Sequence, residues 1–128
     1  MDAGQSAADN EKAGNLAPET AFIHLHAQSA YSLLEGAIPL QKLIDLAIAD
    51  NQPALALTDR SNLFGALEFS QKAAGQGLQP IMGAKLAIDF ADDREQRSGN
   101  QPTHRHEMPP FIVLLAMNET GYNNLVKL

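Results

Sequence analysis

The stretch that decides the fold is residues 53–60, Pro-Ala-Leu-Ala-Leu-Thr-Asp-Arg. Its middle, residues 54–58, is a continuous apolar run of strand length that ends in polar residues. A strand with one solvent-exposed face alternates between apolar and polar residues, whereas a strand that is covered on both faces is apolar throughout. We therefore expect residues 54–58 to form a central strand of an α/β domain.

The segments on either side of this strand have helical spacing. Apolar residues recur with helical periodicity from Leu40 to Ala49. Pro39 suits the first turn of that helix, and the Asn-Gln-Pro sequence at 51–53 ends it. A second helix is expected from Leu63 to Ala74, where the following glycines end it.

Three further strands and a third helix complete the pattern. We expect strands at 22–26, at 80–90 with Gly83 as a candidate kink, and at 111–117, and a helix at 119–128. Strands that alternate with helices describe βαβ units, which require parallel pairing and right-handed crossovers.

The domain organisation follows from the segments that lack periodicity. Residues 1–20 are rich in small and polar residues and are predicted to be a disordered leader. Residues 91–110 are polar and flanked by proline, which is typical of a surface insertion. The last helix has no capping signal and the sheet has an open edge, so we expect 21–128 to be the first part of a larger domain.

The composition excludes several classes of protein. The 128 residues carry a formal charge of −6, so no overall basic field attracts nucleic acid. No cysteine is present, which excludes disulfides, thiolate catalysis and zinc–sulfur sites. The N-terminus lacks the basic start and apolar run of a secretory signal, and no apolar stretch is long enough to span a membrane. We expect a cytoplasmic chain with no membrane partner.

Polar clusters occur at 24–29, 58–60 and 83–85, near the ends of three predicted strands. The carboxyl ends of parallel strands meet on one face of such folds, so these clusters are candidate functional positions. Strand alternation puts His24 and His26 on the same face, where they could share a metal. Satisfied polar residues at a strand end remain the alternative.

Four segments resemble the PHP (polymerase and histidinol phosphatase) domain of bacterial DNA polymerase III alpha subunits. They are residues 22–36, 53–65, 78–84 and 120–125, in the order that the family has, with the variable insertion where the family also varies. The resemblance implies the first portion of a distorted seven-stranded, TIM-like β/α barrel. Complete members hold up to three metal ions that support phosphoester hydrolysis.

The metal-binding pattern of this family is altered in the present sequence. The pattern has a His-x-His pair, a Thr-Asp-His and a Gly-x-Glu, and His26 and Asp59 match it. Gln28 replaces the second histidine, Arg60 the third, and Lys85 the carboxylate. Two fixed cations repel a dication, so we predict a degenerate site without metal, cofactor or catalytic residues. We expect Asp59 to pair with Arg60 or Lys85, or to cap the following helix.

The resemblance therefore implies a non-catalytic structural and docking segment of a DNA-directed DNA polymerase, in its replicative rather than error-prone form. The implied partners are the rest of the alpha subunit, the proofreading exonuclease (epsilon) subunit, and DNA through other domains. Magnesium is expected only in the polymerase palm, outside this segment. The alternatives are a metal-dependent phosphoesterase or 3′–5′ exonuclease and an unrelated α/β binding domain. The histidines at 104 and 106 are expected to lie in a solvated loop.

Overall fold

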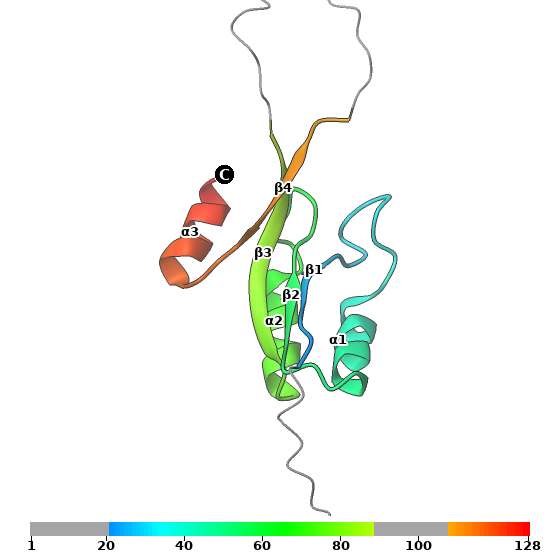
Figure 1. The fold of residues 1–128 in the computed structure, drawn as a ribbon. Helices are drawn as coiled ribbons and strands as arrows, with labels where there is room; N and C mark the ends of the chain where they lie inside the picture. The colour runs from blue at the N-terminus through cyan, green and yellow to red at the C-terminus, as the bar shows by residue number, and fades with distance from the viewer. Residues whose placement is uncertain (1–20, 89–107) are drawn as a thin grey trace, which may run out of the picture.

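The computed structural model describes residues 21–88 and 108–128, so the predicted leader and most of the predicted insertion lie outside the described residues. The elements follow one another as β1 (His24–Ala27), α1 (Leu40–Ala49), β2 (Ala54–Leu57), α2 (Ala66–Gly75), β3 (Gln79–Ala87), β4 (Phe111–Leu115) and α3 (Glu119–Lys127) (Figure 1).

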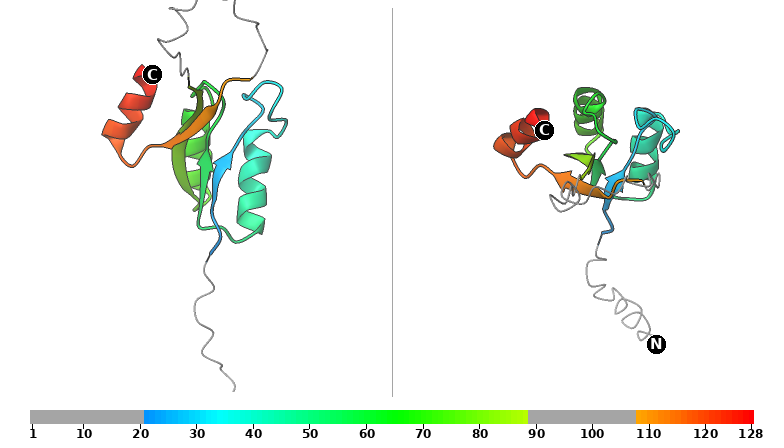
Figure 2. Two further views of the ribbon diagram at one scale, coloured as in Figure 1. Left: turned by 45° about the horizontal axis from the view of Figure 1, so that its top comes forward. Right: turned by 90° about the horizontal axis from the view of Figure 1, so that it is seen from above.

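The four strands form one sheet in the order β1-β2-β3-β4. β1 pairs with β2, and β2 with β3, in parallel. The sheet curls, and the helices lie along one of its faces (Figure 2). This is the curled half of a β/α barrel, as the sequence predicted.

The prediction of parallel pairing is wrong for β4, which runs antiparallel to β3 with Ala87 opposite Phe111. The hydrogen bond from Ile88 N to Pro110 O, 2.8 Å long, continues this ladder beyond the strands. A parallel partner needs a crossover that covers the sheet, usually a helix. Residues 91–110 carry no apolar periodicity from which such a helix could be built, and the chain returns beside the strand it has just left.

The core lies between β2 and the first two helices. All four residues of β2 are buried, which confirms the prediction from the continuous apolar run. α1 has the predicted bounds and packs Ile44 into the core, and α2 contributes Phe69, both fully buried. α2 begins at Ala66 rather than at Leu63, because the Asn62 side chain accepts a hydrogen bond from Phe64 N and holds a turn there.

None of the helices in the described segments has the combination of length and apolarity that crossing a bilayer requires.

Gly83 lies within a continuous β3 and does not interrupt it as a kink. A Cβ atom at this position would lie 2.5 Å from the carbonyl oxygen of Leu114 on β4 and 2.9 Å from Cγ2 of Thr58. The glycine is therefore required because a neighbouring backbone comes too close for a side chain.

Replacing Gly83 with alanine should lower the free energy of unfolding by about 1–3 kcal/mol, since the added methyl group must displace a paired strand. Gly75→Ala is the matched control, because its Cβ would meet nothing within 4 Å at the end of α2. That change should be neutral or stabilising. Urea denaturation of both variants measures the difference, and equal effects would contradict the close-approach explanation.

Candidate functional site

The loops that follow β1 and β2 meet the second half of β3 at one rim of the sheet. Lys85 N donates to Asp59 O at 3.0 Å and Ser61 N donates to Lys85 O at 2.9 Å. These backbone bonds form a short parallel bridge between Arg60 and Lys85 beyond the end of β2. The second and third polar clusters of the sequence are thus brought together as predicted.

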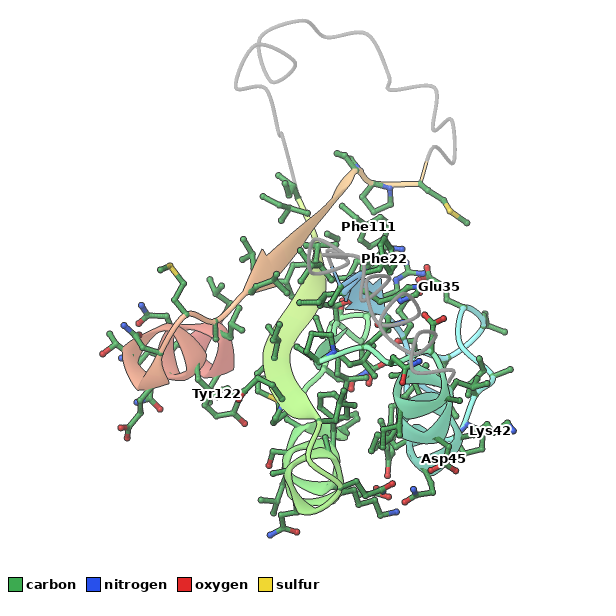
Figure 3. All side chains as sticks on the ribbon, turned by 60° about the horizontal axis from the view of Figure 1, so that its bottom comes forward. Phe22, Glu35, Lys42, Asp45, Phe111 and Tyr122 are labelled. Atoms are coloured by element: carbon green, nitrogen blue, oxygen red, sulfur yellow. The ribbon has the colours of Figure 1, made fainter. Side chains whose placement is uncertain are left out.

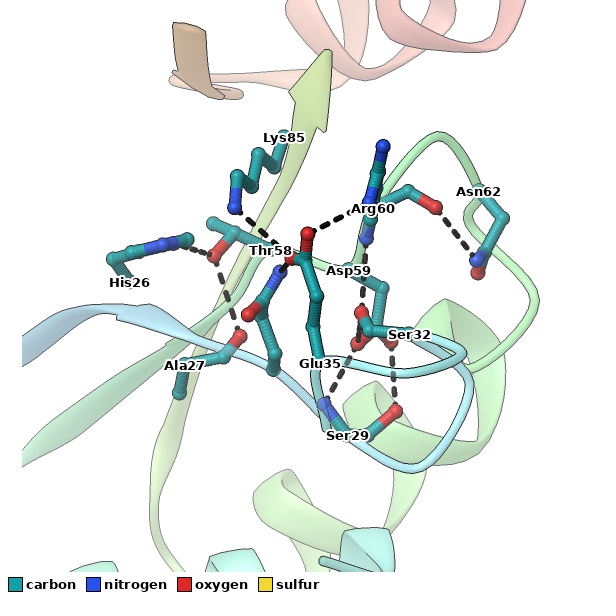
Figure 4. Close-up of polar contacts among 11 residues, drawn as sticks. His26, Ala27, Ser29, Ser32, Glu35, Thr58, Asp59, Arg60, Asn62 and Lys85 are labelled. Atoms are coloured by element: carbon teal, nitrogen blue, oxygen red, sulfur yellow. Dashed lines mark hydrogen bonds and ion pairs between the residues drawn. The ribbon is translucent and has the colours of Figure 1, made fainter. Parts of the chain in front are cut away.

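A carboxylate that the sequence analysis did not single out lies at the centre of this rim. Glu35 Oε1 accepts from Arg60 Nη1 at 2.8 Å, and Glu35 Oε2 accepts from Lys85 Nζ at 2.9 Å. Gln28 Nε2 also donates to Oε2, at 2.9 Å (Figure 4). We call Gln28, Glu35, Arg60 and Lys85 the Glu35 cluster. It joins two loops and a strand through a single side chain.

An aromatic ring from β4 lies against both cations of the cluster. The guanidinium carbon of Arg60 is 4.6 Å from the centroid of the Phe111 ring, and Lys85 Nζ is 4.8 Å from it. Both distances are within the range of cation–π attraction. Phe111 and Glu35 lie close to the same end of the sheet, while Tyr122 on α3 lies away from them (Figure 3). β4 thus contributes to a rim that the sequence analysis built from three strands.

The cluster keeps Glu35 ionised. The hydrogen bonds from Gln28 and Lys85, together with the positive charges of Lys85 and Arg60, lower the pKa of Glu35 from 4.5 to about 2. Two cations share one carboxylate, so these three charged side chains carry one net positive charge.

Asp59 makes a separate and buried network. Its carboxylate accepts from Ser29 N at 2.7 Å, Ser29 Oγ at 2.8 Å and Ser32 Oγ at 2.7 Å. The side chain is almost fully buried, as are both serines. The prediction that Asp59 pairs with Arg60 or Lys85 is wrong, because those side chains reach outward to Glu35 while the loop after β1 presents serine hydroxyls inward. The alternative that Asp59 caps the following helix is also wrong, since the N-cap of α2 is Gly65.

The two histidines of β1 bond to different partners. His26 Nδ1 lies 2.7 Å from Thr58 Oγ1, and this hydroxyl in turn donates to Ala27 O at 3.2 Å. His24 Nδ1 is bonded to the side chain of Gln52 at the opposite end of β2. The register of β1 against β2 shifts between His24 and Ala27. The histidines at 104 and 106 lie outside the described residues.

The side chains at this rim do not suit a divalent metal. Of the ligand positions that the resemblance implies, only His26 and Asp59 carry a metal-binding group, and the Asp59 carboxylate already accepts three hydrogen bonds from Ser29 and Ser32. An amide and two cations occupy the other three, and fixed positive charge opposes a dication. Within residues 21–88 and 108–128, no group of three or more His, Asp or Glu side chains is placed to hold a metal ion.

A curled sheet with polar side chains gathered at the carboxyl ends of its parallel strands is the architecture of a β/α-barrel domain. The chain belongs to the PHP domain family, whose model matches residues 24–128. The resemblance seen in the sequence is thereby confirmed.

Relatives with this domain are named DNA polymerase III subunit alpha. The chain is 46% identical over 107 residues to the protein of Caulobacter vibrioides and 43% identical over 107 residues to that of Treponema pallidum. Each alignment covers 84% of this chain and 9% of the relative, so the chain spans less than a tenth of the length of these relatives.

The fold is also similar to that of a solved amidohydrolase from Chromobacterium violaceum, whose structure holds sulfate and no metal. The TM-score is 0.56 at 25% sequence identity, over 82% of this chain and 32% of that one. This likeness confirms a portion of a TIM-like barrel.

Sequence reasoning missed Glu35, Ser32 and Phe111, and it included Ser29 in a polar cluster without assigning it a role. Glu35 and both serines lie inside the segment 22–36 that carries the resemblance, so a signal was present in that motif. Nothing in the sequence indicated a role for Phe111, because its place beside the cations depends on the antiparallel pairing of β4 with β3.

Ser32→Ala should lower the free energy of unfolding by about 1–3 kcal/mol. The change removes a donor to Asp59 and the acceptor of Arg60 N, leaving both groups short of a partner in a buried place. Ser70→Ala is the control, since the Ser70 hydroxyl is exposed and bonds within α2. Chemical denaturation should show little or no loss for the control, and an equal loss would contradict the role of the buried network.

Glu35 should make stability depend on pH in the acid range. Its pKa falls from 4.5 to about 2 on folding, so its contribution is present above about pH 4.5 and is lost as the pH falls towards 2. Glu35→Gln should remove that part of the pH dependence. Glu68→Gln, which removes a more exposed carboxylate paired with Lys72, should leave most of it. The free energy of unfolding, measured by denaturation at about pH 6, 4 and 3, separates the variants. If it changed with pH in parallel for the wild type and Glu35→Gln, the assignment would be refuted.

Proposed function

We propose that the chain is the PHP segment of a cytoplasmic, replicative DNA polymerase III alpha subunit and that this segment is a structural and docking element without catalytic metal. The family and the names of the relatives support the first part. The second part rests on the chemistry of the rim.

The observation that carries the proposal is the pairing within the Glu35 cluster. Gln28, Arg60 and Lys85 stand at positions where the family has metal ligands, and all three donate to Glu35. Ion pairs and hydrogen bonds then tie the loops together, which is the structural part of what a metal would do. They supply neither a Lewis acid nor a metal-bound hydroxide, so phosphoester hydrolysis loses its means of activating water.

The implied partners follow from this assignment. The rest of the alpha subunit would pack against the segment, and the proofreading exonuclease subunit would dock on its surface. DNA would be bound by other domains, because this chain carries a net charge of −6. Magnesium would be held by the palm of the polymerase. The exonuclease contact can be tested by a pull-down with the full-length subunit.

Metal analysis of the full-length subunit tests the inert site. After supplementation with zinc and manganese, the wild type should retain substoichiometric metal at the PHP segment. The triple variant Gln28→His, Arg60→His, Lys85→Glu should gain metal, because it removes two cations and restores three ligands.

The control for this experiment introduces metal-binding side chains at positions outside the rim cluster. Gln41→His with Lys72→Glu places a histidine on α1 at a partly exposed position and a carboxylate on α2 at an exposed one, and it should gain no metal. Stoichiometric metal in the wild type, or a chelator-sensitive nuclease activity that maps to this segment, would favour the alternative of a metal-dependent phosphoesterase or 3′–5′ exonuclease.

A further inference from the structure

Two leucines project from the loop between β1 and α1. Leu33 is 79% exposed, and Leu34 is 105% exposed, which is the highest value among the exposed large apolar side chains of the described segments. The loop extends beyond the end of α1 at the rim of the sheet (Figure 1). We call Leu33 and Leu34 the leucine tip.

The backbone at the tip is strained. Leu34 has a φ of 68°, in the left-handed region that favours glycine and asparagine. A bulky apolar residue in this conformation, with its side chain fully in water, is unfavourable on both counts. Such outliers persist where surrounding structure enforces them, and they cluster at functional sites.

The residues around the tip fix it in place. Glu35 N donates to Ser32 O at 3.1 Å and Gly36 N donates to the same oxygen at 2.8 Å, closing a tight turn. A Cβ on Gly36 would clash with the carbonyl oxygen of Ser29, so the base of the loop admits no side chain there. Glu35 is anchored to two cations. The two leucines are therefore held outward by a rigid base.

Charge beside the tip defines the partner further. Although the whole chain is acidic, the side chains of Glu35, Arg60 and Lys85 carry one net positive charge, and Glu35 follows Leu34 directly in the chain. A complementary surface would offer an apolar hollow for two leucines with a carboxylate on its border.

We propose that the leucine tip docks into an apolar hollow, bordered by a carboxylate, on another domain of the same polymerase polypeptide. This inference rests on the proposed function. Two leucine side chains offer far less than the roughly 1,000 Å² that an interface between separate proteins needs. Covalent linkage supplies the effective concentration that lets so small a contact persist. The alpha-subunit relatives leave about nine-tenths of their length outside the matched region, which provides such a domain.

Site-specific photocrosslinking in the full-length subunit, with the exonuclease subunit present, tests the proposal. A diazirine side chain at position 34 should form an intramolecular crosslink to a peptide from beyond the PHP segment. The matched control is a diazirine at Leu46, a half-exposed position on α1, which should be quenched by water. A crosslink from position 34 to the exonuclease subunit, a crosslink to a second copy, or quenching by water would each overturn the proposal.

A single substitution gives a second reading that does not depend on crosslinking. Leu34→Asn places a residue suited to the left-handed conformation at φ 68°. Without docking, it relieves strain and leaves the melting midpoint of the full-length subunit unchanged or raised. With docking, the midpoint falls because an apolar contact is lost. DNA polymerase activity of the same preparation separately tests the identity of the polypeptide, so that a failure of the docking inference can be distinguished from a failure of the proposed function.

Discussion

The arrangement of the rim depends on one buried carboxylate. Asp59 follows the central strand β2 at a position with almost no access to water, and a carboxylate in such a place is tolerated only when donors surround it. The loop after β1 supplies those donors from Ser29 and Ser32 and must fold tightly to do so. The tight fold in turn sets where Glu35 emerges. The ion pairs at the surface are thus a consequence of hydrogen bonding beneath them.

Ion pairs, a hydrogen bond and cation–π contacts together hold the Glu35 cluster. One carboxylate holds Arg60 and Lys85, an amide donates to the same group, and the ring of Phe111 lies against both cations. These side chains are only partly buried, so water screens each ion pair and no single pair contributes much. What the cluster supplies is connectivity, because it links β3, β4 and the loops after β1 and β2 at one place.

Much of the fold could be predicted from the sequence. The run at 54–58 identified the buried central strand, and the periodicity from Leu40 to Ala49 gave α1 its observed bounds. The direction of β4 was predicted wrongly, because the rule for alternating strands and helices was applied although residues 91–110 offer no apolar periodicity for a crossover helix. The start of α2 was displaced by a turn that a single asparagine side chain holds.

The sequence predicted which residues gather at the candidate site better than it predicted which partners they bond to. The resemblance located Gln28, Arg60 and Lys85, and the structure brings all three to one place. Their common partner was not predicted, because Glu35 lies seven residues beyond Gln28 along the chain and joins the cluster only through the turn that precedes it. For the same reason Asp59 was assigned to cations when its neighbours are hydroxyl groups.

Mutual pairing in the Glu35 cluster has a consequence for single substitutions. Replacing Arg60 alone with histidine leaves Glu35 with one cationic partner, and replacing Lys85 alone with glutamate sets a second carboxylate next to Glu35. Each change disturbs the balance of charge that the other members of the cluster maintain. The charges at these positions are therefore coupled, so that a change at one is best accommodated by a matching change at another.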